Sequence, residues 1–272
     1  MKPASCCEAG SRSPLDAGTV KTVANIGEAV SRRCEGDIAA TILAFDTAGS
    51  ACSVAAARGS RVLAAERSAL RHGHAEVLMG MIERVMAQAG LAAGELDRLA
   101  ISTGPGGFTG IRAGIAAARG IAVACGVRLV GVSSFDAVAA TLADRAAAFR
   151  LVALDSRRAE LYVQMFDAAC AALGAPVALL PTHLSGYVRE LSGDATLAVA
   201  GDDTERAMAA LAGHAATVVV APDSAPDALG VLEVARRRLV SGAPDGTAAP
   251  LYLRPPDVTF PKTGSPAGSR PR

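Results

Sequence analysis

Apolar runs separated by short turns begin at residue 41, and most have the length of a β-strand or the period of a helix. In chain order they predict three strands, a helix, a strand, a second helix and a strand, over residues 41–45, 51–57, 61–67, 74–89, 98–102, 111–125 and 128–131. A three-strand meander followed by alternating helices and strands predicts an α/β fold.

The second half of the chain begins in the same way as the first. Residues 151–154 form an apolar run that ends at Asp155, and a short turn separates it from a returning strand at residues 161–166. In the first half, Asp46 ends the first strand and residues 47–50 form the turn. The pattern therefore predicts two halves that each open with an apolar strand, an aspartate and a tight turn.

Residues 102–112 join a predicted strand to a predicted helix through four glycines and one proline. Glycine allows close backbone approach, and a helix start leaves its first amides unpaired, so an anion or another protein can sit against such a loop. Gly104, Gly106, Gly107 and Thr109 are therefore candidate phosphate-binding residues. A tight turn with Thr109 as the helix N-cap explains the same residues equally well.

Asp46 and Asp155 are the candidate carboxylates of the duplicated turns. An aspartate just beyond a strand can hold a metal-bound water near a phosphate, and two such turns facing each other would clamp a nucleotide. Aspartate also caps the amides of its own turn without any ligand. From the residues alone, this second interpretation is favoured.

The two predicted helices are candidates for contact with a partner. Apolar residues of the helix at 74–89 cover an arc of roughly 200°, about twice the stripe of a one-sided surface helix. On the helix at 111–125, small residues at four-residue steps allow a neighbouring helix to approach closely. The predicted docking residues are Val77, Leu78, Met81, Ile82, Val85, Gly114, Ala118 and Ile121. Two helices wholly internal to one domain would give the same pattern.

Composition and charge narrow the function classes. The 272 residues are 51% hydrophobic, and 27 basic residues nearly balance 26 acidic ones, so the chain lacks the basic excess of a protein that binds nucleic acid alone. The six cysteines form no CxxC pair, and no membrane segment or signal sequence is apparent, which predicts a cytoplasmic protein without a membrane partner.

Four segments follow from these patterns. Residues 1–38 lack a sustained period and predict a disordered extension, and residues 258–272 are rich in proline and glycine and predict a disordered tail. Between them, residues 39–147 predict a first subdomain that carries the docking helices, and residues 148–257 predict a smaller second subdomain.

Six segments together resemble the TsaB (YeaZ) family. They are residues 42–47, 71–76, 104–112, 130–134, 153–162 and 251–254. GPGGFTGIR at 104–112, followed by VGVSS at 130–134, is the most specific part. The resemblance implies an actin-like duplicated ribonuclease H fold (ASKHA type) with a reduced second half. It also implies a dimerisation subunit of the machinery that places threonylcarbamoyl on N6 of the adenosine next to the tRNA anticodon.

The resemblance further implies that the chain is not an enzyme by itself. The family's catalytic paralogue, TsaD, holds its metal through two histidines in the same register, where this chain has Ser134 and Val138. Valine cannot coordinate a metal. We therefore expect no catalytic residue, no metal and no cofactor of the chain's own.

The partners implied by the resemblance are TsaD and the ATPase TsaE, with tRNA reached only through the complex. The two docking helices and Arg112 would face TsaD, with ATP or ADP as a candidate ligand near that interface, and a homodimer is expected when the partner is absent. The alternative is a free-standing actin-like phosphotransferase or hydrolase that uses Asp46 and Asp155 on a nucleotide. Nucleotide turnover by the chain alone would distinguish the two.

Overall fold

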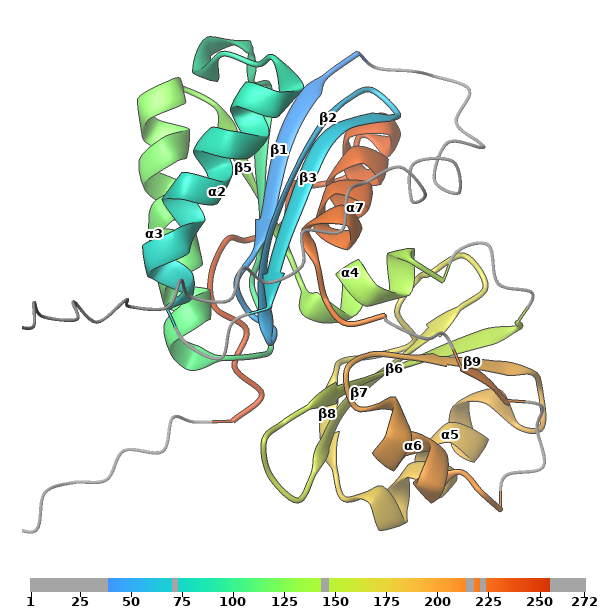
Figure 1. The fold of residues 1–272 in the computed structure, drawn as a ribbon. Helices are drawn as coiled ribbons and strands as arrows, with labels where there is room; N and C mark the ends of the chain where they lie inside the picture. Colours follow the sequence, from blue (N-terminus) through green and yellow to red (C-terminus); the bar gives the residue numbers. More distant parts are fainter. Residues whose placement is uncertain (1–38, 70–72, 143–146, 214–217, 221–223, 255–272) are drawn as a thin grey trace, which may run out of the picture.

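The computed structural model describes residues 39–69, 73–142, 147–213, 218–220 and 224–254, which form two lobes (Figure 1). The chain begins with β1 (Thr41–Asp46), β2 (Ala51–Arg58), β3 (Arg61–Ala69), α2 (His74–Ala89), the short 3-10 helix η1 (Ala93–Glu95), β4 (Arg98–Ser102), α3 (Phe108–Cys125), β5 (Arg128–Val132) and α4 (Ser134–Ala140). It continues with β6 (Phe149–Asp155), β7 (Leu161–Asp167), β8 (Val177–Leu179), α5 (Pro181–Ser192), β9 (Leu197–Ala200), α6 (Thr204–Ala210), β10 (Val218–Val220) and α7 (Ala228–Ser241). The predicted segments 1–38 and 258–272 lie outside the described residues.

The two sheets repeat one strand order. In the first sheet the order is β3-β2-β1-β4-β5, with β1 antiparallel to β2 and parallel to β4. In the second it is β8-β7-β6-β9-β10, with β6 antiparallel to β7 and parallel to β9. Each sheet thus has its third, second, first, fourth and fifth strands in that spatial order. This duplication confirms the predicted α/β fold of actin-like type.

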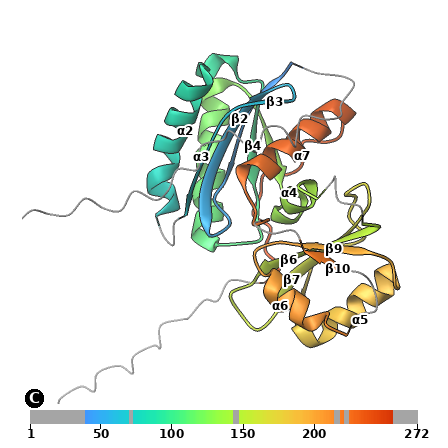
Figure 2. The same ribbon diagram turned by 45° about the vertical axis from the view of Figure 1, so that its right-hand side comes forward.

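Helices cover both faces of the first sheet. Two neighbouring helices, α2 and α3, pack on one face around Phe45, Leu99 and Ile101, while α7 and α4 pack on the other around Ile42 and Ala44 (Figures 1 and 2). Alternate residues of β1 therefore enter opposite cores, as the two-residue period of a strand requires. We call this sheet with α2, α3, α4 and α7 the first lobe.

The position of α7 corrects the predicted domain boundary. Residues 148–257 were expected to form one continuous second subdomain, but α7 packs against β1 and β2 of the first sheet. The apolar residues of β1 that point away from α2 and α3 must be shielded from solvent. The chain re-enters the first lobe after β10, and α7 packs over these residues.

The second lobe consists of β6–β10 with α5 and α6. Leu184 and Val188 of α5 and Ala207 of α6 pack on one face of its sheet. On the other face, Phe135 and Val138 of α4 pack with Val152, so α4 belongs to the packing of both lobes. Residues 245–254, which we call the terminal strap, also join the lobes. Its Leu251 amide donates to the Thr103 carbonyl at 2.8 Å, and its Leu253 packs against the second lobe.

The glycine loop enters α3 one turn earlier than predicted. The N-cap is Gly107, which has no side-chain capping bond, and Thr109 lies inside the helix. Among the described residues, α3 is the helix long and apolar enough to cross a membrane by length and composition. Six of its residues are buried against the first lobe, including Ile111 and Ile115, and the core helix of a globular protein passes the same test.

Candidate functional site

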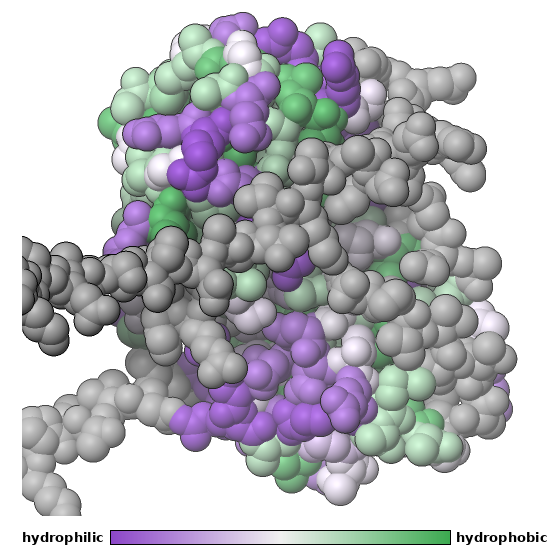
Figure 3. Space-filling model, viewed as in Figure 1, coloured by the Kyte–Doolittle hydropathy of each residue, from purple (hydrophilic) through white to green (hydrophobic). Residues whose placement is uncertain are grey.

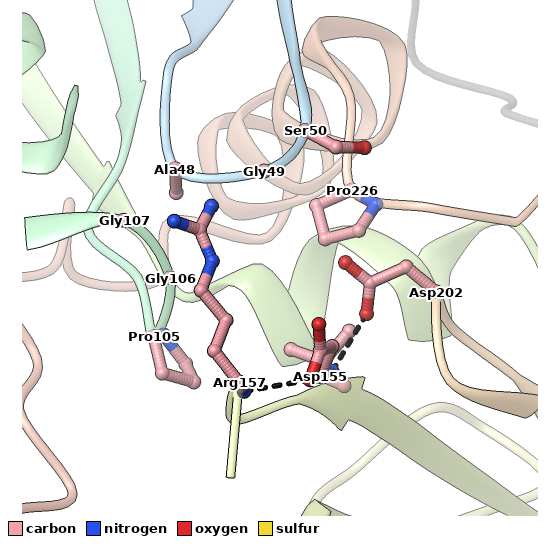
Figure 4. Close-up of a pocket in the computed structure, with 11 residues that line it drawn as sticks. Ala48, Gly49, Ser50, Pro105, Gly106, Gly107, Asp155, Arg157, Asp202 and Pro226 are labelled. Atoms are coloured by element: carbon pink, nitrogen blue, oxygen red, sulfur yellow. Dashed lines mark hydrogen bonds between the residues drawn. The ribbon is translucent and has the colours of Figure 1, made fainter. Parts of the chain in front are cut away.

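A small cavity lies where the duplicated turns of the two lobes meet (Figure 4). Its volume is about 50 Å³. It is lined by Ala48, Gly49, Ser50, Pro105, Gly106, Gly107, Leu154, Asp155, Arg157, Asp202 and Pro226. The first lobe contributes the β1–β2 turn, the glycine loop and Pro226 just before α7. The second lobe contributes the end of β6 with its following turn, and Asp202, two residues after β9.

The first-lobe wall is held together by direct backbone contact. The Gly107 amide donates to the Ala48 carbonyl at 2.7 Å. A Cβ atom on Gly106 would lie 2.2 Å from the same carbonyl oxygen, which no side chain tolerates. Glycine is therefore required at 106 for the loop to close on the β1–β2 turn.

The second-lobe wall is organised around Asp155. Its Oδ1 accepts from the Arg157 amide at 2.6 Å, and its own amide donates to Asp202 Oδ1 at 2.8 Å. Arg157 has the left-handed φ of 58° and extends its guanidinium toward Ala48 of the opposite wall (Figure 4). A cationic side chain thus occupies the space between the two turns.

Asp46 lies behind this cavity and does not line it. The side chain is fully buried, and its two carboxylate oxygens accept from the Ala48 and Gly49 amides, both at 3.4 Å. The pKa of Asp46 is raised to about 6, mainly by burial and to a smaller extent by the Asp227 carboxylate, and this value includes the lowering by the Ser102 hydroxyl and the two amides. Ionisation of Asp46 at neutral pH therefore lowers the stability of the folded protein.

The N-terminus of α7 lies beside this buried carboxylate. Asp227 caps α7 by accepting from the Gly230 amide at 2.9 Å, and the Ala228 amide donates to Ser53 Oγ at 2.9 Å. Ser53 pairs with Asp46 across β1 and β2. Burial likewise raises the pKa of the Asp227 carboxyl.

The structure brings together only part of the predicted phosphate-binding set. Gly106, Gly107 and Asp155 line the cavity, whereas Asp46 is buried behind it. Gly104 and Thr109 do not line the cavity: Gly104 is buried with a φ of 95°, and Thr109 is exposed on the first turn of α3.

Two charged lining residues were missed by sequence reasoning. Arg157 belongs to a recognised turn, but nothing in its sequence context indicates that its side chain reaches across the cavity. Asp202 is the second residue after the apolar strand β9, so its position just beyond a strand was a usable signal.

Most of the predicted docking residues face the core of the first lobe, whereas we expected them to face a partner. Leu78, Met81, Ile82 and Val85 are buried in the first-lobe core, as are Gly114 and Ala118 of α3. Val77 and Ile121 are half-buried, and Arg112 is exposed. The helical projection gave α2 a wide apolar arc but did not say which residues of that arc meet the sheet. The residues around Met81 do so.

Apolar and small residues on the outward side of these two helices form another set. We call it the outer α2–α3 surface, and it consists of the exposed or half-buried residues Met79, Met86, Ala116, Ala117, Gly120, Ile121, Val123 and Ala124. Charged residues, among them Glu83, Arg84 and Arg119, are exposed on the same helices. Met79 is 46% exposed and Val123 is 85% exposed. In the view of Figure 3, hydrophilic residues gather across the second lobe, whereas hydrophobic and hydrophilic residues are mixed over the first.

Within the described ranges, no group of three or more His, Cys, Asp or Glu side chains is placed to hold a metal ion. Ser134 and Val138, which stand at the ligand positions implied by the resemblance to the catalytic paralogue, are both buried in α4. Neither side chain lines the cavity.

Comparison with known proteins gives one consistent relationship. The family model for tRNA N6-adenosine threonylcarbamoyltransferase (TsaD) matches residues 67–176. The tRNA threonylcarbamoyladenosine biosynthesis protein TsaB of Haemophilus influenzae is 35% identical over 124 residues, 45% of this chain and 52% of that protein. TsaB of Escherichia coli is 35% identical over 122 residues, 44% of this chain and 52% of that protein. The chain thus spans about half the length of the curated relatives it matches.

A solved structure extends the similarity over the whole of a relative. The structure of YeaZ from Pseudomonas aeruginosa superimposes with a TM-score of 0.67 at 26% sequence identity. The match covers 79% of this chain and 100% of that one. Both lobes are therefore shared with that structure, not only the segment aligned by sequence.

Proposed function

We propose that this chain, which belongs to the TsaB (YeaZ) family, is a non-catalytic dimerisation subunit of the complex that adds threonylcarbamoyl to N6 of the adenosine next to the tRNA anticodon. Its partners are the catalytic paralogue TsaD and the ATPase TsaE, and it reaches tRNA through that complex in the cytoplasm. Without TsaD, the same surface supports a homodimer.

The observation that carries this proposal is the outer α2–α3 surface. Two adjacent helices present small residues and a largely exposed valine, which lets the helices of a partner approach closely. A standard interface would cover about 800 Å² per partner. Because Met81 and its buried neighbours hold the helices on the sheet, the partner contact falls to the outward residues, Val123 above all.

The interlobe cavity supports a scaffold over the alternative, a free-standing nucleotide-dependent phosphotransferase or hydrolase. Ligand pockets usually enclose about 300–1,000 Å³, and this cavity encloses about 50 Å³. Asp46, the first carboxylate of that alternative, is buried behind the β1–β2 turn, and the Arg157 guanidinium extends between the walls. If ATP or ADP takes part, we place it near the interface with the partner.

The decisive experiment introduces a charge on the outer surface. Val123→Asp is expected to abolish co-elution with the paralogue while the variant keeps the thermal midpoint of the wild type. Val240→Asp is the matched control, because Val240 is also exposed but lies on α7, on the opposite face of the first sheet. Retained co-elution of Val123→Asp would contradict the proposed interface.

A reconstitution assay tests the role itself. With the paralogue, the ATPase, ATP, an activated threonylcarbamoyl donor and unmodified tRNA present, threonylcarbamoyl-adenosine should form only when this chain is added, and the chain alone should form none. Product formed equally well without the chain would contradict a required subunit. ATP turnover by the purified chain alone would favour the phosphotransferase or hydrolase instead.

A further inference from the structure

An aromatic and cationic cluster lies on the surface where α3 begins. The Arg112 guanidinium carbon lies 3.7 Å from the centroid of the Phe108 ring and 5.8 Å from that of Tyr252. The two rings stack with centroids 5.6 Å apart at an interplanar angle of 29°. Arg112 Nε also donates to Tyr252 Oη at 2.8 Å. We call these three side chains the aromatic platform.

The chain holds this platform from two directions. Phe108 and Arg112 stand on the first turns of α3, whose buried face is fixed in the first lobe. Tyr252 is carried by the terminal strap between two anchored residues, because the Leu251 amide bonds to Thr103 and the Leu253 side chain packs on the second lobe. Rings fixed in this way lose little conformational entropy when a ligand stacks on them.

The platform is open to solvent, and its charge is positive. Phe108 is 41% exposed and Tyr252 is 39% exposed, although both rings are large and apolar. The charged residues of α3 are Arg112 and Arg119, and the strap adds Asp245, which pairs with Arg128, and Arg254, which pairs with Glu160. Arg119 donates to the Ala248 carbonyl at 2.8 Å, so the positive charge in contact with the rings is that of Arg112.

We propose that the aromatic platform stacks an unpaired base of the RNA substrate, with Arg112 facing the adjacent phosphate. The inference rests on the proposed function, which brings tRNA to the complex. Proteins bind single-stranded RNA through exposed aromatic side chains on which bases stack, combined with arginines that face the backbone. The balanced charge of the whole chain fits a contact that adds to, rather than replaces, binding by a partner.

The affinity test uses the complex of this chain with its paralogue and a fluorescently labelled, unmodified tRNA transcript at one fixed salt concentration. Phe108→Ala and Tyr252→Ala should each weaken binding about 5- to 150-fold, the range for loss of one stacked base. Leu180→Ala is the control, because Leu180 is also 41% exposed but precedes α5 in the second lobe. It should bind as the wild type does.

A direct signal for stacking is available because the chain contains no tryptophan. Tyr252→Trp places a reporter in the platform, and its fluorescence should be quenched when RNA is added to the complex, after subtraction of the wild-type complex. Leu180→Trp should not be quenched. A purely structural role for the rings would not produce this difference.

Three results would overturn the proposal. The first is unchanged affinity in both alanine variants, and the second is a wild-type complex that does not bind the transcript. The third is loss of co-elution with the paralogue or the ATPase in the alanine variants, which would assign the platform to a protein contact. Failure of the platform alone leaves co-elution and the requirement for the chain intact, so it is distinguishable from failure of the proposed function.

Discussion

The two lobes place an aspartate at the same point of the same topology and treat it differently. Asp46 ends β1 and is fully buried beside the start of α7, with a pKa raised by burial to about 6. Asp155 ends β6 and is exposed, and it caps its turn by accepting from the Arg157 amide. One sequence signal therefore gives an ordinary turn cap in one lobe and a poorly solvated carboxylate in the other. The packing around the turn makes the difference.

The helical layers differ between the lobes as well. The first sheet has two helices on each face. The second sheet has α5 and α6 on one face, and its other face packs against α4 of the first lobe. The α2–α3 layer is therefore complete without the second lobe and keeps an outward side for other contacts. The two sheets have the same strand order, and the helices packed on them differ. Because of that difference, the first lobe keeps an outward helical surface that no other part of the described chain covers.

The largest effect is expected from a charge in the α2 side of the first-lobe core. Met81→Asp places a carboxylate at a fully buried position among the apolar side chains of the first-lobe core, and should lower the free energy of unfolding by about 4 kcal/mol or more. Met79→Asp, two residues earlier and 46% exposed, should change it by less than about 0.5 kcal/mol. Urea unfolding of both variants makes the measurement.

The same pair of variants checks which side of α2 meets the sheet. If Met79→Asp were the more destabilising of the two, the assigned orientation of the helix would be wrong. Loss of partner binding in Met81→Asp alone would say nothing about the interface, because the fold itself is damaged.

Asp46→Asn should remove a pH dependence from the stability of the protein. The folded-state pKa of about 6 lies above the ordinary aspartate value of 3.8, so the folded protein binds this proton more tightly than the unfolded chain. The free energy of unfolding therefore rises as pH falls from 7 through 6 toward 4, by about 3 kcal/mol in total. An asparagine carries no charge and removes that cost, although its Nδ2 cannot accept from a backbone amide as the carboxylate oxygen does. The loss of that bond does not depend on pH, so the stability of the variant relative to the wild type should be highest at pH 7 and fall toward pH 4.

Urea unfolding at several pH values measures this difference between Asp46→Asn and the wild type. Asp155→Asn is the matched control at the equivalent point of the second lobe, where the side chain is exposed, and should shift stability by less than about 0.5 kcal/mol. An Asp46→Asn variant whose stability relative to the wild type stays constant or rises as pH falls would contradict the assigned environment.

Gly106→Ala should separate the glycine loop from the β1–β2 turn. The added Cβ would meet the Ala48 carbonyl oxygen at 2.2 Å, and this backbone contact cannot yield as a flexible side chain would. We expect a loss of about 2 kcal/mol of unfolding free energy. Gly120→Ala is the control, because nothing lies within 4 Å of its added Cβ and alanine favours a helix.

Thermal unfolding compares the two glycine variants. The control should be neutral or slightly stabilised while Gly106→Ala is clearly destabilised. Equal midpoints for both variants would mean that the stability of the protein does not depend on the close approach of the glycine loop to the β1–β2 turn.

Local patterns predicted the elements up to β7 well, except α4 and the short η1, whereas no bounds were predicted for the elements from β8 to α7. The helix His74–Ala89 and the strand Arg98–Ser102 match the structure residue for residue, and the other predicted strands end within two residues of the observed ones. Their apolar runs are bounded by turn residues, and both signals are local. The paired Asp46 and Asp155 turns also predicted the duplication, because each is a short segment with the same order of strand, aspartate and turn.

Long-range packing was out of reach of the same patterns. Periodicity gave α2 a wide apolar arc but could not say that Met81 faces inward and Met79 outward. Nor could it place α7 on the first sheet, because that contact joins residues far apart in the chain. At the site, Arg157 closes the cavity through the direction of its side chain, which only the fold determines.

The smallest effect is expected from the ion pair that ties the lobes together through the strap. Arg254 pairs with Glu160 of the β6–β7 turn, and both side chains are partly exposed. Such pairs contribute about 0–1 kcal/mol because water and salt screen them. A double-mutant cycle with Arg254→Ala and Glu160→Gln should therefore give a coupling free energy below about 1 kcal/mol. The Arg58–Glu95 pair within the first lobe, at 3.0 Å and more exposed, is the matched cycle and should couple no more strongly.

A coupling well above that of the matched pair would mean that the relation between the lobes depends on this one contact. A small value would instead assign that relation to the packing of α4 and Leu253 between the lobes.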